Sequence, residues 1–122
     1  MAFPDIAIKA THIELDPTLT VLLTEKLQTL DKFLGEESDV RCEAEFEKIA
    51  PHQSGEIHRV EVNLWRAGAL FRAEATERNF EAAIDEVRNE LDKELRRAND
   101  KRDTMLKQGG RKIKEMMRFG DK

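Results

Sequence analysis

The spacing of apolar residues predicts two amphipathic helices. Leucines recur every three or four residues between Asp16 and Gly35, and the same period returns from Phe80 to Ala98. Asp16, which is followed by proline, and Asn79 are suited to cap free N–H groups at the two helix starts. Gly35 is suited to end the first helix because glycine readily adopts the left-handed conformation.

Alternating apolar and polar residues predict short strands. The alternation is regular over residues 40–47 and 58–65, returns over 71–75, and a short apolar run covers 6–13. Arg66-Ala67-Gly68 fits a three-residue hairpin loop with glycine in the left-handed position. The order of elements is therefore strand, helix, three strands and helix.

This order predicts the α+β fold class. We expect a β-α-β-β-β-α two-layer sandwich, in which a four-stranded sheet carries both helices on one face. The first helix is long enough to act as a crossover, so the strands that it joins are candidates for parallel pairing, and the others should be antiparallel. The expected domain spans residues 1–106. The helical pattern fails at Gly109-Gly110, so residues 107–122 should form a basic C-terminal tail that is flexible on its own.

Charge is distributed unevenly along the 122 residues. The chain has a net charge of −4, but residues 93–122 hold 11 basic and 5 acidic residues, whereas residues 1–92 hold 10 basic and 20 acidic ones. The acidic domain thus has a basic C-terminal end that suits a polyanionic partner.

Several features indicate a cytoplasmic protein. The single cysteine, Cys42, excludes an internal disulfide and fits a reducing compartment. The N-terminus has no signal-peptide pattern, and no apolar run is long enough to span a membrane.

The second helix carries a basic stripe. Lys93, Arg97 and Lys101 are spaced by four residues and lie beside Arg96 and Arg102. Basic residues continue into the tail at Arg111, Lys112, Lys114 and Arg118. One interpretation is a ridge that binds phosphates in a salt-dependent way, and the other is an ordinary solvated helix end whose cations complement the helix dipole.

The remaining polar residues match no catalytic or metal-binding pattern. The outer sheet face should carry mixed, slightly acidic charges with Trp65 as its only aromatic residue, unlike a base-stacking platform. The soft metal ligands have no metal-motif spacing: His12, His52, His58 and Cys42. The chain has no glycine-rich phosphate loop and no G-x-S-x-G motif. We therefore predict no enzyme, no metal, no cofactor and no small-molecule substrate.

The chain resembles a known family in two long segments. These are IAIKATHIELDPTLTVLLTEKLQTLDKF near the N-terminus and VEVNLWRAGALFRAEATERNFEAAIDEVRNELDKELRR further on. They are similar to the first strand and helix, the hairpin and the second helix of the short ribosome hibernation promoting factors and ribosome-associated inhibitors, also called sigma-54 modulation proteins. The resemblance covers roughly residues 6 to 102 in the same order.

The resemblance implies a fold related to the double-stranded RNA-binding domain. It also implies binding of rRNA in the decoding region of the small ribosomal subunit, which stops translation and protects idle ribosomes in stress or stationary phase. Basic positions of the family fall on Lys26, Lys32, Lys93, Arg97 and Lys101. Relatives often carry Lys or Arg where this chain has Thr20, Thr29, Thr76 and Glu90. The basic tail is a candidate to compensate for these missing charges.

The combined interpretation is a non-enzymatic ribosome hibernation factor. Its expected partners are the small ribosomal subunit and the whole ribosome, and we expect a monomeric short form without a further ribosome-pairing domain. The predicted rRNA-binding residues are Lys26, Lys32, Lys93, Arg96, Arg97, Lys101 and Arg102, with possible tail contacts from Arg111, Lys112, Lys114 and Arg118. The alternative is an acidic protein-interaction module that docks a protein regulator without binding ribosomes.

Overall fold

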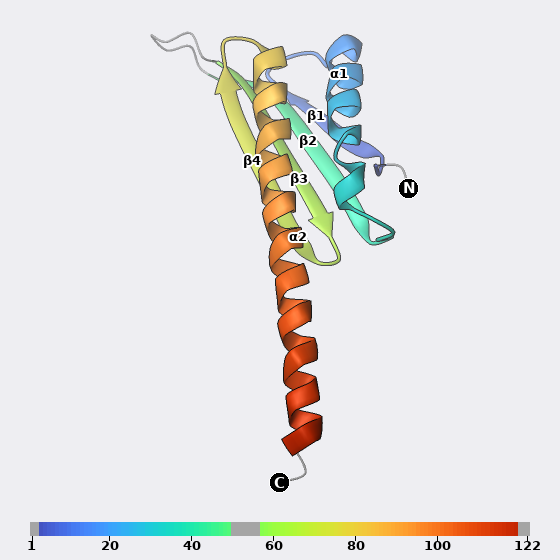
Figure 1. Cartoon of the computed structure of the whole chain (residues 1–122). Coiled ribbons are helices and arrows are strands. Elements are labelled where there is room, and N and C mark those ends of the chain that lie inside the picture. Colours follow the sequence, from blue (N-terminus) through green and yellow to red (C-terminus); the bar gives the residue numbers. More distant parts are fainter. Residues whose placement is uncertain (1–2, 50–56, 120–122) are drawn as a thin grey trace.

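A computed structural model describes the backbone of residues 3–49 and 57–119, and the side chains of residues 3–49 and 57–108. The elements follow the order β1 (Ile6–Thr11), α1 (Pro17–Gln28), the 3₁₀ helix η1 (Asp31–Phe33), β2 (Val40–Lys48), β3 (His58–Arg66), β4 (Ala69–Glu77) and α2 (Phe80–Phe119). Figure 1 shows α1 and α2 on the same face of the sheet. The predicted α+β class and β-α-β-β-β-α order are confirmed.

The sheet has the strand order β1-β2-β3-β4. β1 pairs with β2 in parallel, and the β2–β3 and β3–β4 pairs are antiparallel. α1 supplies the crossover that the parallel pair requires, as predicted.

The core lies between the sheet and the two helices. Every second residue of the sheet turns inward, and the alternation predicted for residues 40–47 and 58–65 is confirmed by buried Cys42, Ala44, Phe46, Val60, Val62 and Leu64. α2 packs on β3 and β4, and its Phe80 ring also meets Phe46 of β2 edge to face with centroids 5.5 Å apart. The alanines of β4 leave room for a helix to approach the sheet closely.

Both predicted helix caps are present. Asp16 Oδ1 accepts a hydrogen bond from the Thr18 amide at 2.8 Å. Asn79 Oδ1 accepts one from the Ala82 amide at 2.7 Å. Each satisfies a backbone donor that has no partner inside its helix.

The first helix ends earlier than its leucine pattern predicts. α1 stops at Gln28, and the chain continues through η1 to Gly35, which has a φ of 58°. The amides of Thr29 and Leu30 bond to carbonyls three residues back, which tightens the last turn. Leu30 still reaches the core, so the apolar period survives the change of helix type.

The β3–β4 hairpin has a two-residue loop rather than the predicted three-residue one. Arg66 belongs to β3 and pairs with Ala69 of β4. Ala67 and Gly68 have φ values of 50° and 85°, the two positive values that a type I′ turn requires. The Ala67 amide donates a hydrogen bond to the Asp39 carbonyl at 2.8 Å, which ties the turn to the start of β2.

The second helix is longer than its apolar pattern predicts. α2 has 40 residues and continues through Gly109 and Gly110, so it extends well beyond the sheet (Figure 1). Each glycine costs about 1 kcal/mol of helix stability relative to alanine, and the flanking Lys, Arg, Met and Glu residues favour a helix. The division into a domain at 1–106 and a tail at 107–122 stays a prediction.

Candidate nucleic-acid interface

Lys26 lies at the junction of α1 and α2. Its Nζ is 3.0 Å from Oδ1 of Asp85 on α2. Arg88, which no sequence pattern indicates, donates a hydrogen bond to Thr29 Oγ1 at 2.9 Å and pairs with Asp92 at 3.0 Å. These cations are already engaged with partners on the two helices, so they join α1 to α2 as well as adding positive charge.

Phe33 brings together two predicted rRNA-binding residues that are far apart in the sequence. The Lys32 ammonium lies 5.2 Å and the Arg96 guanidinium 5.1 Å from the centroid of its ring. Both distances are within the range of a cation–π contact. Arg96 also donates to Asp92 Oδ1 at 3.2 Å, and both cations remain exposed to solvent. The 3₁₀ turn η1 thus places one basic residue of the first half beside one of α2.

Arg66 holds this end of the molecule together. It is 8% exposed, and one of its nitrogens donates to the Phe33 carbonyl at 3.0 Å and to Asn99 Oδ1 at 2.7 Å. The Asn99 amide donates to the same carbonyl at 3.2 Å, and the Arg66 guanidinium lies 5.0 Å from the Phe71 ring centroid. Strands β3 and β4, η1 and α2 therefore meet at one buried cation.

Arg102 lies close to this cation. Burial lowers the pKa of Arg66, and the positive charge of Arg102 lowers it further. Arg102 itself is exposed. We name the surface formed by Lys32, Arg96 and Arg102 around Phe33 and Arg66 the basic end.

Lys93, Arg97 and Lys101 form a separate flank of α2. Their spacing of four residues turns the helix by about 40° each time, and Arg97 is about 100° around the axis from Arg96. All three are exposed, and Arg97 pairs with Glu94 at 3.2 Å. Within the part of the chain whose side chains are described, no hydrogen bond or ion pair joins this flank to α1 or η1. The seven predicted residues therefore occupy several sides of the helical layer rather than one patch.

The four possible tail contacts fall where only the backbone is described. Arg111, Lys112, Lys114 and Arg118 belong to α2, and their side chains lie outside the described residues. Their role stays a prediction.

Cations on the outer face of the sheet are largely neutralised by carboxylates. Arg59 pairs with Glu47 at 3.0 Å, and further partners of the same guanidinium are Glu45, Glu61 and Glu74. Against the effect of burial, Glu74 and its neighbours raise the pKa of Arg59. Although burial alone would raise the pKa of Glu61, its contacts with Arg72 and Arg59 lower it. The mixed character predicted for this face takes the form of a connected ion-pair network.

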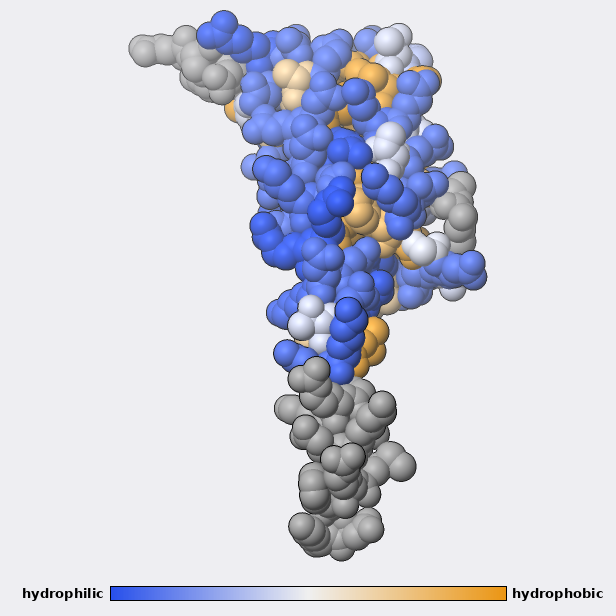
Figure 2. All heavy atoms as spheres, viewed as in Figure 1, coloured by the Kyte–Doolittle hydropathy of each residue, from blue (hydrophilic) through white to orange (hydrophobic). Residues whose placement is uncertain are grey.

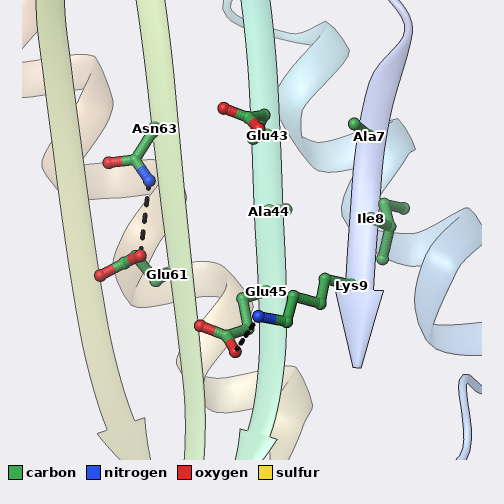
Figure 3. Close-up of a pocket in the computed structure, with 8 residues that line it drawn as sticks. All are labelled: Ala7, Ile8, Lys9, Glu43, Ala44, Glu45, Glu61 and Asn63. Atoms are coloured by element: carbon green, nitrogen blue, oxygen red, sulfur yellow. Dashed lines mark hydrogen bonds and ion pairs between the residues drawn. The ribbon is translucent and has the colours of Figure 1, made fainter. Parts of the chain in front are cut away.

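A shallow hollow of about 230 Å³ lies on the same face. Figure 3 shows Glu45, Glu61 and Asn63 around it, with the Lys9 side chain reaching from β1 to Glu45. Small Ala7 opposite Glu43 creates the space. Lys9 and Thr11 both contact Glu45, and the Thr11 hydroxyl contributes most to lowering the pKa of that carboxyl.

Trp65 is covered from one side. The Arg41 guanidinium lies 4.2 Å from its ring centroid, so this face of the indole is occupied. The contact agrees with the prediction that the sheet is not a base-stacking platform.

The other candidate chemistry has simple structural explanations. Cys42 is buried between sheet and helices, and burial raises the pKa of its thiol to about 12. His58 packs against Phe80 with ring centroids 4.8 Å apart. Among the described residues, no three His, Cys, Asp or Glu side chains are placed to hold a metal ion. No helix in that part of the chain is long and apolar enough to cross a membrane.

The sequence profile described as "Sigma 54 modulation protein / S30EA ribosomal protein" matches residues 6–103. The chain belongs to this family. The match covers every strand, α1 and the part of α2 that packs on the sheet, including all residues of the basic end.

Two solved structures share the fold. The N-terminal domain of Thermus thermophilus Protein Y is 19% identical, with a TM-score of 0.64 over 77% of this chain and 98% of that one. A ribosomal subunit interface protein from Coxiella burnetii is 16% identical, with a TM-score of 0.62 over 78% of this chain and 97% of that one. A comparison with curated protein sequences finds no match.

Proposed function

We propose that this protein is a ribosome-associated translation inhibitor that acts as a hibernation factor in the cytoplasm. It binds rRNA in the decoding region of the small subunit by reversible charge and shape complementarity and catalyses no reaction. Membership of the S30EA family supports the ribosome as partner. The name of the Coxiella burnetii protein, a ribosomal subunit interface protein, points the same way.

The observation that carries the rRNA proposal is the basic end. Three cations from η1 and α2 lie around one buried arginine, and Lys32 and Arg102 form no ion pair within the described residues. Cations that are not neutralised within the protein can neutralise phosphates and release counterions. Fixed side chains lose less conformational entropy on binding, so the contacts of Lys32 and Arg96 with the Phe33 ring favour recognition of folded RNA.

The Lys93 flank provides a second set of phosphate contacts. Lys93, Arg97 and Lys101 are exposed along one side of α2, on a rigid helix. Two flanks about 100° apart would let α2 lie in a groove between RNA strands and contact both. The tail residues Arg111, Lys112, Lys114 and Arg118 would extend these contacts along the same helix.

The test is co-sedimentation of the purified protein with ribosomes and separated subunits through sucrose gradients at low and high salt. We expect salt-sensitive comigration with small subunits and whole ribosomes. Protein that stays at the top of the gradient at every salt concentration would overturn the proposal.

A matched pair of variants locates the interface. Lys93→Ala/Arg97→Ala/Lys101→Ala should reduce comigration strongly. Lys9→Ala/Arg41→Ala/Arg72→Ala removes the same number of charges from the outer sheet face and should change comigration little. Equal losses from both variants would show that net charge alone governs binding and would contradict a defined interface.

A further inference from the structure

The side of α2 that packs on the sheet continues beyond the end of the sheet. At about 100° per residue, Ala98 and Met105 fall on the same side of the helix as Val87 and Leu91. Val87 and Leu91 are fully buried, whereas Met105 is 60% exposed. Around Met105, α2 therefore exposes to solvent the same side that is buried in the core around Val87 and Leu91.

A groove lies along this exposed part of the helix. It has a volume of about 460 Å³ and is lined by Ala98, Lys101, Arg102, Met105 and Leu106. Leu106 is 67% exposed, so two large apolar side chains lie side by side in solvent. Figure 2 shows this hydrophobic area where α2 leaves the domain, on a surface that is otherwise mostly hydrophilic. Covering these apolar side chains with an apolar partner would remove them from water and is therefore favourable.

The charges around the groove are of one sign. Lys101 and Arg102 line it, whereas helical spacing places Asp100 and Asp103 on the opposite side of α2. The surface thus combines an apolar centre with a basic margin. A complementary surface has apolar residues in its centre and carboxylates at its margin.

We propose that this surface of α2 binds an amphipathic helix of a partner protein, with apolar residues along one side and Glu or Asp beside them. Met105 and Leu106 supply the apolar contact, and Lys101 and Arg102 pair with the carboxylates. From Ala98 to Phe119 the helix is about 33 Å long, enough to pair with three heptads of a partner helix.

Two other occupants fit the surface less well. In the proposed complex with rRNA, phosphates would pair with Lys101 and Arg102 but would leave Met105 and Leu106 without an apolar partner. A partner helix would therefore cover the apolar residues that RNA leaves exposed and would compete with RNA for these two cations. A second copy would bring like charges together, because residues 98–119 contain seven basic and three acidic residues.

The test measures fluorescence anisotropy with a synthetic helical peptide of three heptads, which has Leu at the a and d positions and Glu at e and g. We expect saturable binding in the micromolar range, typical of a small interface. A peptide with Lys in place of every Glu should not bind.

Two double variants test the apolar and the basic residues of the surface separately, and two single variants serve as controls. Met105→Ser/Leu106→Ser and Lys101→Glu/Arg102→Glu should each weaken peptide binding about tenfold or more. Lys107→Glu changes a charge on the opposite side of α2, and Val21→Ser removes an exposed apolar residue of α1. Both control variants should bind the peptide as the native protein does. All these positions are exposed, so the folded domain should be retained.

The other outcomes each overturn the proposal. Absence of saturable binding, or equal weakening by the two controls, would exclude a specific apolar groove. Loss of ribosome comigration in Met105→Ser/Leu106→Ser, with no peptide binding, would assign the surface to RNA. A concentration-dependent sedimentation coefficient that the same variant abolishes would assign it to a second copy of the chain.

Discussion

Arg59 and Arg66 lie on the same strand, but they belong to two differently organised regions. Arg59 faces the outer side of the sheet and contacts four glutamates, so its charge is neutralised by side chains of the same surface. Arg66 faces the helical layer and bonds to a backbone carbonyl and an amide side chain, neither of which carries a charge. On the outer face, carboxylates thus neutralise the arginine at the centre of the network. At the basic end, the central Arg66 is bound by uncharged groups, and of the cations around it Arg96 pairs with a carboxylate, Asp92. This difference explains how an acidic protein can still have a surface suited to RNA.

The largest expected effect comes from removing Arg66. Arg66→Met should lower the free energy of unfolding by about 2 to 3 kcal/mol, because the Phe33 carbonyl and Asn99 lose a buried donor. Urea denaturation measures the loss, which should depend little on salt because the hydrogen-bond partners of Arg66 are uncharged.

Arg59→Met is the matched control for this effect. Removing the Arg59 side chain leaves four glutamates close together. The loss of stability in this variant should therefore shrink as salt screens the repulsion between them. The same salt dependence in both variants would contradict the contrast between the two regions.

A smaller effect is expected from paired removal of exposed charges. Lys32→Ala/Arg96→Ala should weaken ribosome binding about tenfold, because in the proposed complex each residue would neutralise a phosphate. Lys9→Ala/Arg72→Ala removes the same amount of positive charge from the outer sheet face, where both cations already form ion pairs with glutamates. We expect less than about a twofold change for this second pair, measured by co-sedimentation at a fixed salt concentration. A reversed ranking would place the RNA on the sheet.

The smallest effect concerns the stability of the outer face at acid pH. The Thr11 hydroxyl, helped by Arg59 and Lys9, lowers the pKa of Glu45 below its ordinary value of 4.5. The ionised carboxyl therefore stabilises the folded state. This contribution to the free energy of unfolding is present above pH 4.5 and is lost as the pH falls through the lower pKa that Glu45 has in the folded protein.

The control for this pH effect is Glu45→Gln. The variant should be less stable than the native protein at pH 7, and the difference should shrink toward pH 3. Urea midpoints across this range measure it. A constant difference would show that Glu45 acts through packing rather than charge.

The fold could be predicted from local patterns because most of its features are local. The two caps, the alternation in β2 and β3 and the period of the helices depend on residues only a few positions apart. The errors also have local causes. The hairpin loop was predicted one residue too long, because a positive φ at Ala67 is uncommon for a residue other than glycine.

The candidate site was less predictable because it depends on distant contacts. No spacing rule relates Arg66 to Phe33 or to Asn99, each of which is 33 positions away. The basic stripe on α2 could be identified from the sequence. The different contacts of its members could not: Arg96 lies over the Phe33 ring of η1, whereas Arg97 pairs with Glu94.

The contact between Phe33, Arg66 and Asn99 also determines the order in which the protein can assemble during synthesis. Arg66 is 33 residues after Phe33 and Asn99 is 66 residues after it, so the Phe33 carbonyl gains its second donor only when most of the chain has been made. Closing so long a segment is slow compared with forming either helix. A nascent chain will therefore have its strands and its first helix before it has a complete basic end. The proposed RNA-binding surface will form only as the last quarter of the sequence folds.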